Sequence, residues 1–205
     1  MRGIFMDFST LSNNLEKKGY RVTICRTKEE AAAYLDEAIH GKTVGMGGSV
    51  TLDELGLYEK LQAHNKMYWH WRQEMTPEEA KLASYQADVY LSSLNGVAET
   101  GELVNIDGNG NRVAATLAAH EHVYFVIGRN KVAPTLEKAI HRARNIAAPK
   151  NAQRLGCKTP CAIKADHCYD CKSPERICCT LNVLFEKPRA KTIYEVVLID
   201  EELGY

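Results

Sequence analysis

Residues 122–128, HVYFVIG, form the most apolar run of the chain, and Arg129-Asn130-Lys131 follows them at once. A continuous apolar run of this length is typical of a strand that is buried on both faces of a parallel sheet. Polar residues directly after such a strand lie at the carboxyl edge of the sheet, where α/β proteins bind their ligands. The run therefore predicts an α/β fold with a candidate ligand site at its end.

Strand and helix patterns alternate on both sides of this run. Further strands are expected at 20–25, 43–46, 66–71, 87–92, 181–185 and 192–198. Helical patterns occupy 28–40, the residues after 49, the residues after the Thr76-Pro77 start, and 134–147. Alternating residues at 97–111, with the Asp107-Gly108 pair, predict a hairpin. Together they predict a mostly parallel sheet flanked by helices, in one domain spanning 1–205.

The composition excludes several classes of protein. The 205 residues are 45% hydrophobic and 25% charged, which argues against disorder and against a coiled coil. The 26 basic and 26 acidic residues cancel, so no broad electrostatic footprint for nucleic acid is expected. No apolar run approaches the ~18 residues of a membrane span, and the N-terminal residues lack a signal-peptide pattern. We expect a cytoplasmic protein without a membrane or nucleic-acid partner.

Six of the seven cysteines lie within residues 157–179, just before the last strands. In a cytosolic chain of this size, clustered cysteines bind metal more often than they form disulfides. The spacing Cys161-x6-Cys168-x2-Cys171-x6-Cys178 has one close pair with wider flanks, which favours a 4Fe-4S cluster. Zinc is the alternative, although zinc ribbons use two close pairs. Cys157 and Cys179 stand outside this set, and reduced thiols without a metal are the remaining interpretation.

Three loops after predicted strands are candidate ligand sites. Val44–Ser49 is rich in glycine and precedes a helix, so its backbone amides could approach an anion; a tight packing turn is the alternative. In the second loop, Glu99 is a candidate base, nucleophile or hydrogen-bond acceptor, or else a structural partner of Arg112. In the third, Lys131 is placed to neutralise a carboxylate or phosphate, or else is a solvated surface lysine.

Three separated blocks resemble the LUD-domain (lactate-utilisation) family. They are VGMGGSVTLDELGL at 44–57, SLNGVAETGELVNIDGNGNRVAATLAAHEHVYFVIGRNKV at 93–132, and VVLIDEELGY at 196–205. The stretch TPCAIKADHCYDCKSPERICC at 159–179 resembles the smaller members, with the four cysteines at Cys161, Cys168, Cys171 and Cys178. The resemblance implies a fold similar to glucosamine-6-phosphate isomerase, ribose-5-phosphate isomerase and CoA transferases.

The resemblance also implies which residues contact a ligand over the glycine-rich loops. These are Gly45, Gly47, Gly48, Ser49, Glu99, Thr100, Gly101, Gly128, Asn130 and Lys131. It implies a part in the oxidation of L-lactate to pyruvate, in which related proteins act together.

Three functions stay open at this point. The first is an iron–sulfur redox component that works with partner proteins and binds a small anionic metabolite. The second is a non-redox enzyme of the isomerase or CoA-transferase type, with Glu99 as its catalytic carboxylate and a structural metal. The third is a metabolite- or redox-sensing module without catalysis. The chain has no flavin or nicotinamide signature, so an oxidation of two electrons would need a partner. The sequence does not decide between a monomer and a homo-oligomer.

Overall fold

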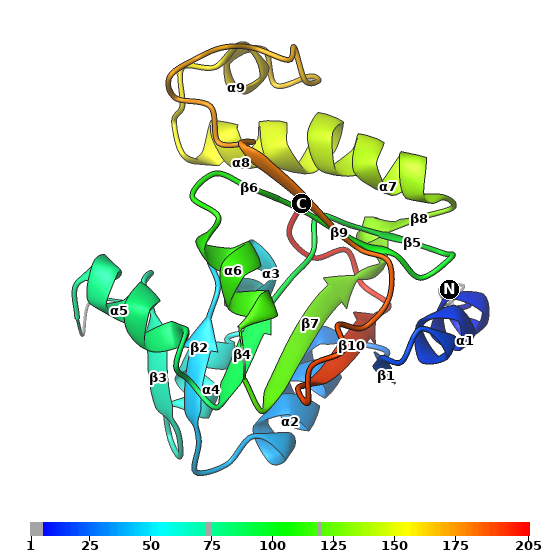
Figure 1. Ribbon diagram of the computed structural model, residues 1–205, viewed down its shortest axis with the longest axis vertical. Coiled ribbons are helices and arrows are strands. Elements are labelled where there is room, and N and C mark those ends of the chain that lie inside the picture. The colour runs from blue at the N-terminus through cyan, green and yellow to red at the C-terminus, as the bar shows by residue number, and fades with distance from the viewer. Residues whose placement is uncertain (1–5, 73–74, 119) are drawn as a thin grey trace.

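A six-stranded parallel sheet forms the centre of the computed structural model, which describes residues 6–72, 75–118 and 120–205. Its strands run in the order β1-β10-β7-β4-β2-β3, and every neighbouring pair is parallel (Figure 1). The strands are β1 (Arg21–Cys25), β2 (Thr43–Met46), β3 (Lys66–Trp69), β4 (Val89–Ser92), β7 (His122–Gly128) and β10 (Ile193–Ile199). The predicted α/β fold is confirmed, and HVYFVIG is an inner strand.

A second, four-stranded sheet lies beside the first in the order β8-β5-β6-β9. It contains β5 (Gly96–Ala98), β6 (Leu103–Asp107), β8 (Val132–Ala133) and β9 (Thr180–Leu184). The predicted hairpin exists as the antiparallel pair β5–β6, but its turn is at 99–102 instead of Asp107-Gly108. The carboxylate of Asp107 accepts hydrogen bonds from the backbone amides of Asn109, Gly110 and Val113. That cap begins helix α6 (Asn111–Leu117) and ends the strand.

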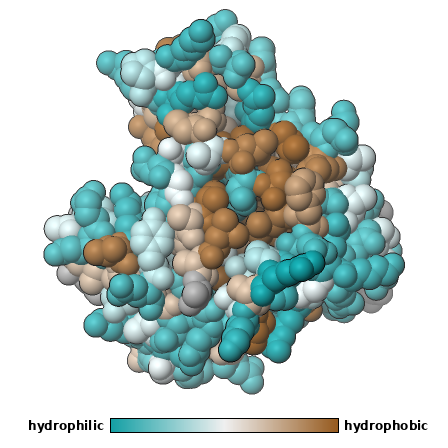
Figure 2. Space-filling model, in the orientation of Figure 1, coloured by the Kyte–Doolittle hydropathy of each residue, from teal (hydrophilic) through white to brown (hydrophobic). Residues whose placement is uncertain are grey.

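The last two strands separate into different sheets. Strand β10 inserts between β1 and β7, and all but its first residue are buried. Strand β9 pairs with β6 at the edge of the second sheet, which leaves Leu181 and Phe185 exposed. Figure 2 shows apolar side chains gathered on this face of the molecule, below the mostly polar α9 region. Only a strand that is apolar on both faces can occupy an inner position of a covered sheet.

Helices cover both faces of the parallel sheet. Val44, Tyr124 and Val126 pack into one apolar cluster with α2 (Lys28–Ala38), α3 (Val50–Glu54) and α4 (Leu57–Leu61). Val123 and Phe125, on the opposite face of β7, pack against α1 (Ser9–Lys17) and the second sheet. Helix α5 (Pro77–Ser84) contacts β2 and β3. No helix in the described ranges is long and apolar enough to cross a membrane.

The second sheet is covered on its outer side by one long helical stretch, as Figure 1 shows. This stretch joins α7 (Leu136–Arg142), a π-helical turn (Ala143–Ala147) and α8 (Ala148–Arg154). Ala139, Ala143 and Ala148 pack against the sheet, because small side chains let helix and sheet approach closely. The helix predicted at 134–147 is therefore present and continues to 154. The short helix α9 (Pro160–Lys164) follows and opens the cysteine segment.

Local sequence explains where several helices begin. Thr27, Ser49 and Thr135 each accept a backbone amide hydrogen bond as N-caps of α2, α3 and α7. Thr76 and Glu79 form the capping box that begins α5, with Pro77 in its first turn. The sequence did not predict α1, which has no side-chain cap and is held instead by Leu11 and Leu15 in the core.

Candidate functional site: a cationic cleft at the carboxyl edge of the sheet

A cleft of about 500 Å³ opens where the parallel strands end. Its lining includes Gly48 after β2, Trp71 after β3, Ser93 after β4 and Lys131 after β7. Helix α8 and the residues just before β9 line it from the other side. This edge is where the position of HVYFVIG predicted a ligand site, because connecting loops in open α/β sheets leave a crevice there.

The side chains that line the cleft are strongly cationic. They include one carboxylate, Asp107, against five cations: Lys81, Arg112, Lys131, Arg154 and Arg176. The chain as a whole has equal numbers of acidic and basic residues, so the excess is local to this surface. A concave site lined by one sign of charge concentrates ligands of the opposite sign. The cleft is therefore suited to a small anion.

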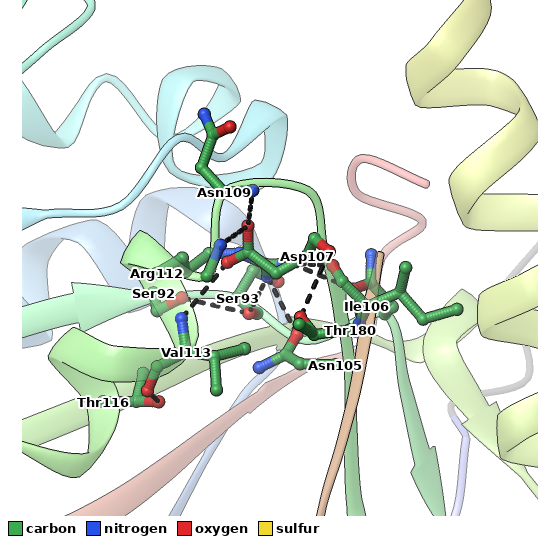
Figure 3. Close-up of polar contacts among 12 residues, drawn as sticks. Ser92, Ser93, Asn105, Ile106, Asp107, Asn109, Arg112, Val113, Thr116 and Thr180 are labelled. Carbon is green, nitrogen blue, oxygen red and sulfur yellow. Dashed lines mark hydrogen bonds and ion pairs between the residues drawn. The ribbon is translucent and has the colours of Figure 1, made fainter. Parts of the chain in front are cut away.

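Asp107 lines the cleft and is held in place by contacts with α6 and with the residues at the start of β9. Its carboxylate caps α6, as described above, and lies 4.0 Å from the Nε of Arg112. Its carbonyl oxygen accepts from the amide of Cys179, 3.0 Å away, and from the hydroxyl of Thr180, 3.1 Å away (the Thr180 contact is drawn in Figure 3). Its single negative charge offsets part of the positive charge of the lining, mainly at Arg112, and leaves the cleft cationic.

Arg112 holds the loops around the cleft together by hydrogen bonds. It donates to the carbonyl oxygens of Ser93 and Ile106 and to the side-chain oxygens of Asn95 and Asn105, all within 3.0 Å (the Ser93 contact is drawn in Figure 3). Burial lowers the pKa of Arg112, while the negative charge of Asp107 opposes that shift. The guanidinium thus contributes charge to the cleft and joins the ends of β4 and β6.

Lys131 is buried, so the interpretation as a solvated surface lysine is wrong. Its Nζ donates to the hydroxyls of Thr51 and Ser93, at 2.7 and 2.8 Å. Burial lowers its pKa to about 7, helped by the positive charges of Arg142 and Arg112 and opposed by Glu54. At neutral pH this amine therefore exists in both protonation states, unlike a surface lysine.

The first glycine loop contributes to the cleft in part. Gly48 and Ser49 line it. Gly45 instead lies against α5, where an added Cβ would be 2.8 Å from the carbonyl oxygen of Ser84. Gly47 lies against Tyr90, whose hydroxyl would be 2.9 Å from such a Cβ. Gly45 and Gly47 thus allow close packing behind the loop, which was the alternative interpretation of the motif.

Gly128 and Asn130 hold the C-terminal residues. An added Cβ on Gly128 would lie 2.7 Å from the amide nitrogen of Leu203. The side chain of Asn130 accepts from that amide and donates to the carbonyl of Gly204, at 3.1 and 3.3 Å. Tyr205, at the end of this segment, lines the cleft. These two residues position a wall of the cleft, and neither is part of its lining.

The loop that carries Glu99, Thr100 and Gly101 lies at the other end of β5, against α1. The backbone carbonyl of Glu99 accepts from Asn14, at 2.8 Å, and Thr100 donates to Glu102. Gly101 has a φ of +96° and packs against Lys18, so a glycine is needed there. None of the three is among the residues that line the cleft.

Most residues of the cleft were not singled out from the sequence as ligand contacts, among them Thr51, Ser93, Trp71 and the basic residues Lys81, Arg112, Arg154 and Arg176. Thr51 and Ser93 hold Lys131, and Ser93 directly follows β4 just as Lys131 follows β7. The strand-end rule applied to Ser93 would have found it. Of the two tryptophans, Trp69 is buried in the core. Trp71 instead lines the cleft beneath Arg154, whose guanidinium carbon lies 4.9 Å from the ring centroid.

The cysteine segment adjoins the cleft through Arg176, Ile177 and Cys179. None of the seven cysteines is joined in a disulfide. Cationic groups surround the sulfurs: Arg144 lies 3.8 Å from the Sγ of Cys168, and the Cys178 thiol raises the pKa of Arg176. This donor chemistry suits thiolates bound to a metal. The described side chains nevertheless include no group of three or more His, Cys, Asp or Glu placed to hold one ion, so the metal site stays a prediction.

Similarity to known proteins identifies the family of this chain. A model of the LUD domain matches residues 9–199. The crystal structure of a DUF162 family protein from Deinococcus radiodurans is similar with a TM-score of 0.53 and 11% identity, covering 94% of this chain and 99% of that one. The eIF2B beta structure from Chaetomium thermophilum has a TM-score of 0.31 and 14% identity, covering 62% of this chain and 43% of that one. No curated protein matches. Because the family model spans most of its length, the chain belongs to the LUD-domain family.

Proposed function

We propose that this protein binds a small anionic metabolite in the cationic cleft and acts in organic-acid metabolism of the L-lactate-to-pyruvate type. The observation that carries the proposal is the charge of the cleft, which has four cationic side chains beside Lys131 and one carboxylate, in a chain of zero net charge. Carboxylates and phosphates are the anions that such groups bind best. The volume of about 500 Å³ suits a metabolite and is too small for a macromolecule.

We further propose that the cysteine segment 157–179 carries a thiolate-bound metal centre, a 4Fe-4S cluster or else zinc. Cys161, Cys168, Cys171 and Cys178 would hold it. A cluster would exchange single electrons with redox partner proteins, whereas zinc would only fix the segment against the cleft. The contacts of Arg144 and Arg176 with this segment support thiolates there. We do not propose a non-redox enzyme with Glu99 as its catalytic carboxylate, because Glu99 is not among the residues that line the cleft.

Anion binding is tested by thermal shift and calorimetry with L-lactate, pyruvate and inorganic phosphate. The informative variants are Arg154→Met, in the cleft, and Lys150→Met, exposed on the same helix α8. Both remove one positive charge. Loss of a cation near a bound anion costs about 1 kcal/mol in a solvated cleft, so Arg154→Met should weaken binding about fivefold and Lys150→Met should not. Equal effects in both variants, or no anion bound at all, would overturn the proposed site.

The metal proposal is tested on protein purified without oxygen. About four irons and four sulfides per chain, with visible absorbance that bleaches on reduction, would support the cluster. About one zinc without colour would support the structural alternative. Cys168→Ser should abolish either metal, and Cys25→Ser, which changes a buried thiol outside the segment, should leave it bound. Full metal content in Cys168→Ser would refute the assigned ligands.

A further inference from the structure

The amine of Lys131 has a setting that anion binding alone does not require. It lies at the end of an inner strand, it is buried, and it lines the cleft. Its two hydrogen-bond partners are neutral hydroxyls, and the ion pairs found among the described residues do not include it. A buried ammonium normally needs a carboxylate in contact with it, and Glu54, which favours the charged form, makes no ion pair with Nζ, so a structural role would leave this charge poorly compensated.

We propose that Lys131 is a nucleophilic amine that forms an imine with the carbonyl group of an anionic oxo compound, such as a 2-oxo acid, bound in the cleft. The inference deepens the proposed function, because the cationic lining would hold the anionic group of that compound. It assigns a chemical step and a substrate class to one side chain.

The hydrogen bonds of Lys131 suit this step. Two of the three positions on Nζ are occupied by N–H donation to Thr51 and Ser93. In the neutral amine, the remaining tetrahedral position holds the lone pair. Thr51 also donates to the carbonyl of Leu203, 3.3 Å away, which fixes its oxygen as an acceptor for the lysine. The two hydroxyls therefore hold the amine with its nucleophilic position unoccupied by either of them.

The charges around Lys131 favour the neutral, reactive amine. The positive charges of Arg142 on α7 and Arg112 on α6 disfavour protonation of Lys131, whereas the negative charge of Glu54 on α3 favours it. Burial acts in the same direction as the arginines and dominates, so the pKa falls to about 7. Desolvation beside another cation is a recognised means of activating a lysine toward carbonyl compounds.

The step balances without an external oxidant or reductant. The Nζ lone pair forms a bond to the carbonyl carbon, and the carbonyl π electrons move to oxygen. A proton passes from nitrogen to that oxygen, which gives the carbinolamine. The second proton of the nitrogen passes to the hydroxyl group, the carbon–oxygen bond breaks as water leaves, and the nitrogen lone pair forms the carbon–nitrogen double bond. Ser93, in contact with Nζ and in the cleft lining, is placed to relay the proton. The imine can accept an electron pair from a bond on the neighbouring carbon.

Borohydride trapping tests the inference. The purified protein is mixed with pyruvate or glyoxylate as probe, reduced, and examined by intact mass and peptide mapping. We expect one adduct with pyruvate, equal in mass to pyruvate less one oxygen atom, on Lys131. The adduct should be absent in Lys131→Met and retained in Lys150→Met, which changes an exposed lysine outside the cleft lining. Ser93→Ala should slow trapping about fivefold, the worth of one lost hydrogen bond.

L-lactate separates this inference from the proposed function, because it carries the anion and has no carbonyl carbon to attack. Lactate and pyruvate that both bind in calorimetry, with no trapped adduct from either oxo acid, would overturn the imine and leave anion binding intact. If L-lactate, pyruvate and inorganic phosphate all fail to bind, the proposed function itself is overturned. An adduct on other lysines that persists in Lys131→Met would also contradict the assignment.

Discussion

The Nζ of Lys131 lies 2.8 Å from the hydroxyl oxygen of Ser93, a residue 38 positions earlier in the chain. The two residues follow adjacent parallel strands, β7 and β4, whose register pairs Val89 with His122 and Ser92 with Phe125. Sheet pairing thus sets this contact before any ligand is present. A site held by two inner strands needs little ordering when a ligand binds, which favours tight and selective binding.

Lys131→Met should change how stability depends on pH. The pKa of Lys131 is about 7 when folded and near 10.5 when unfolded, so the unfolded chain binds more protons between these values. This residue therefore makes the free energy of unfolding rise with pH from about 7 to 10, by up to about 1.4 kcal/mol per unit. The loss of stability that comes from burying the charged amine is fully present below pH 7. The variant should gain stability over the parent at pH 6 and lose that advantage by pH 10.

Urea unfolding of both proteins at pH 6, 7, 8 and 9 gives this difference directly, because other titrating groups cancel. Lys150→Met, which removes an exposed lysine, should show no such trend. A constant difference between Lys131→Met and the parent across this range would show that the folded pKa of Lys131 is ordinary.

Asp107→Ala should destabilise the protein by about 2–4 kcal/mol. The change removes the acceptor for three backbone amides at the start of α6 and leaves the half-buried Arg112 without its carboxylate partner. Asp107→Asn keeps one side-chain oxygen and should lose roughly half as much. Denaturant melts measure both. Equal stability of Asp107→Ala and the parent would mean that the loop caps α6 in another way.

Gly128→Ala should loosen the C-terminal residues. A Cβ there would lie 2.7–2.8 Å from the amide of Leu203, the side chain of Asn130 and the carbonyl of Glu201. Overpacking of this kind costs about 1–3 kcal/mol. Hydrogen exchange at the Leu203 amide should quicken in Gly128→Ala. In Gly41→Ala, where only the left-handed backbone opposes the change, that amide should exchange as in the parent. Unchanged exchange in both would contradict the proposed packing.

The cysteines should differ in reactivity in metal-free protein. Burial raises the pKa of Cys25 to about 11, so it should resist iodoacetamide at pH 8 until the protein unfolds. The six cysteines of segment 157–179 are exposed or half-buried and should be alkylated in the folded state. Peptide mass spectrometry after timed labelling distinguishes them. Labelling of Cys25 as fast as Cys179 would contradict the buried placement.

Local sequence determined most of the secondary structure, because its signals are short-range. The apolar run at 122–128 indicated an inner strand, and Thr76 with Glu79 indicated a helix start; both are present. The hairpin turn was misplaced because Asp107-Gly108 is typical both of a turn and of a helix cap. Only the hydrogen bonds of Asp107 to Asn109, Gly110 and Val113 decide between them.

Tertiary structure alone decided which strand-end residues share a site. Lys131 follows the predicted strand at 122–128, and the Glu99 loop was expected after the predicted strand at 87–92, but β5 of the second sheet intervenes before Glu99. The two therefore lie in different places, Lys131 at the cleft and the Glu99 loop against α1. The sequence by itself determined the α/β fold, the glycine-rich loop and the cysteine spacing. Sheet order and burial, which depend on contacts between distant residues, determined the cationic cleft and the unusual amine within it.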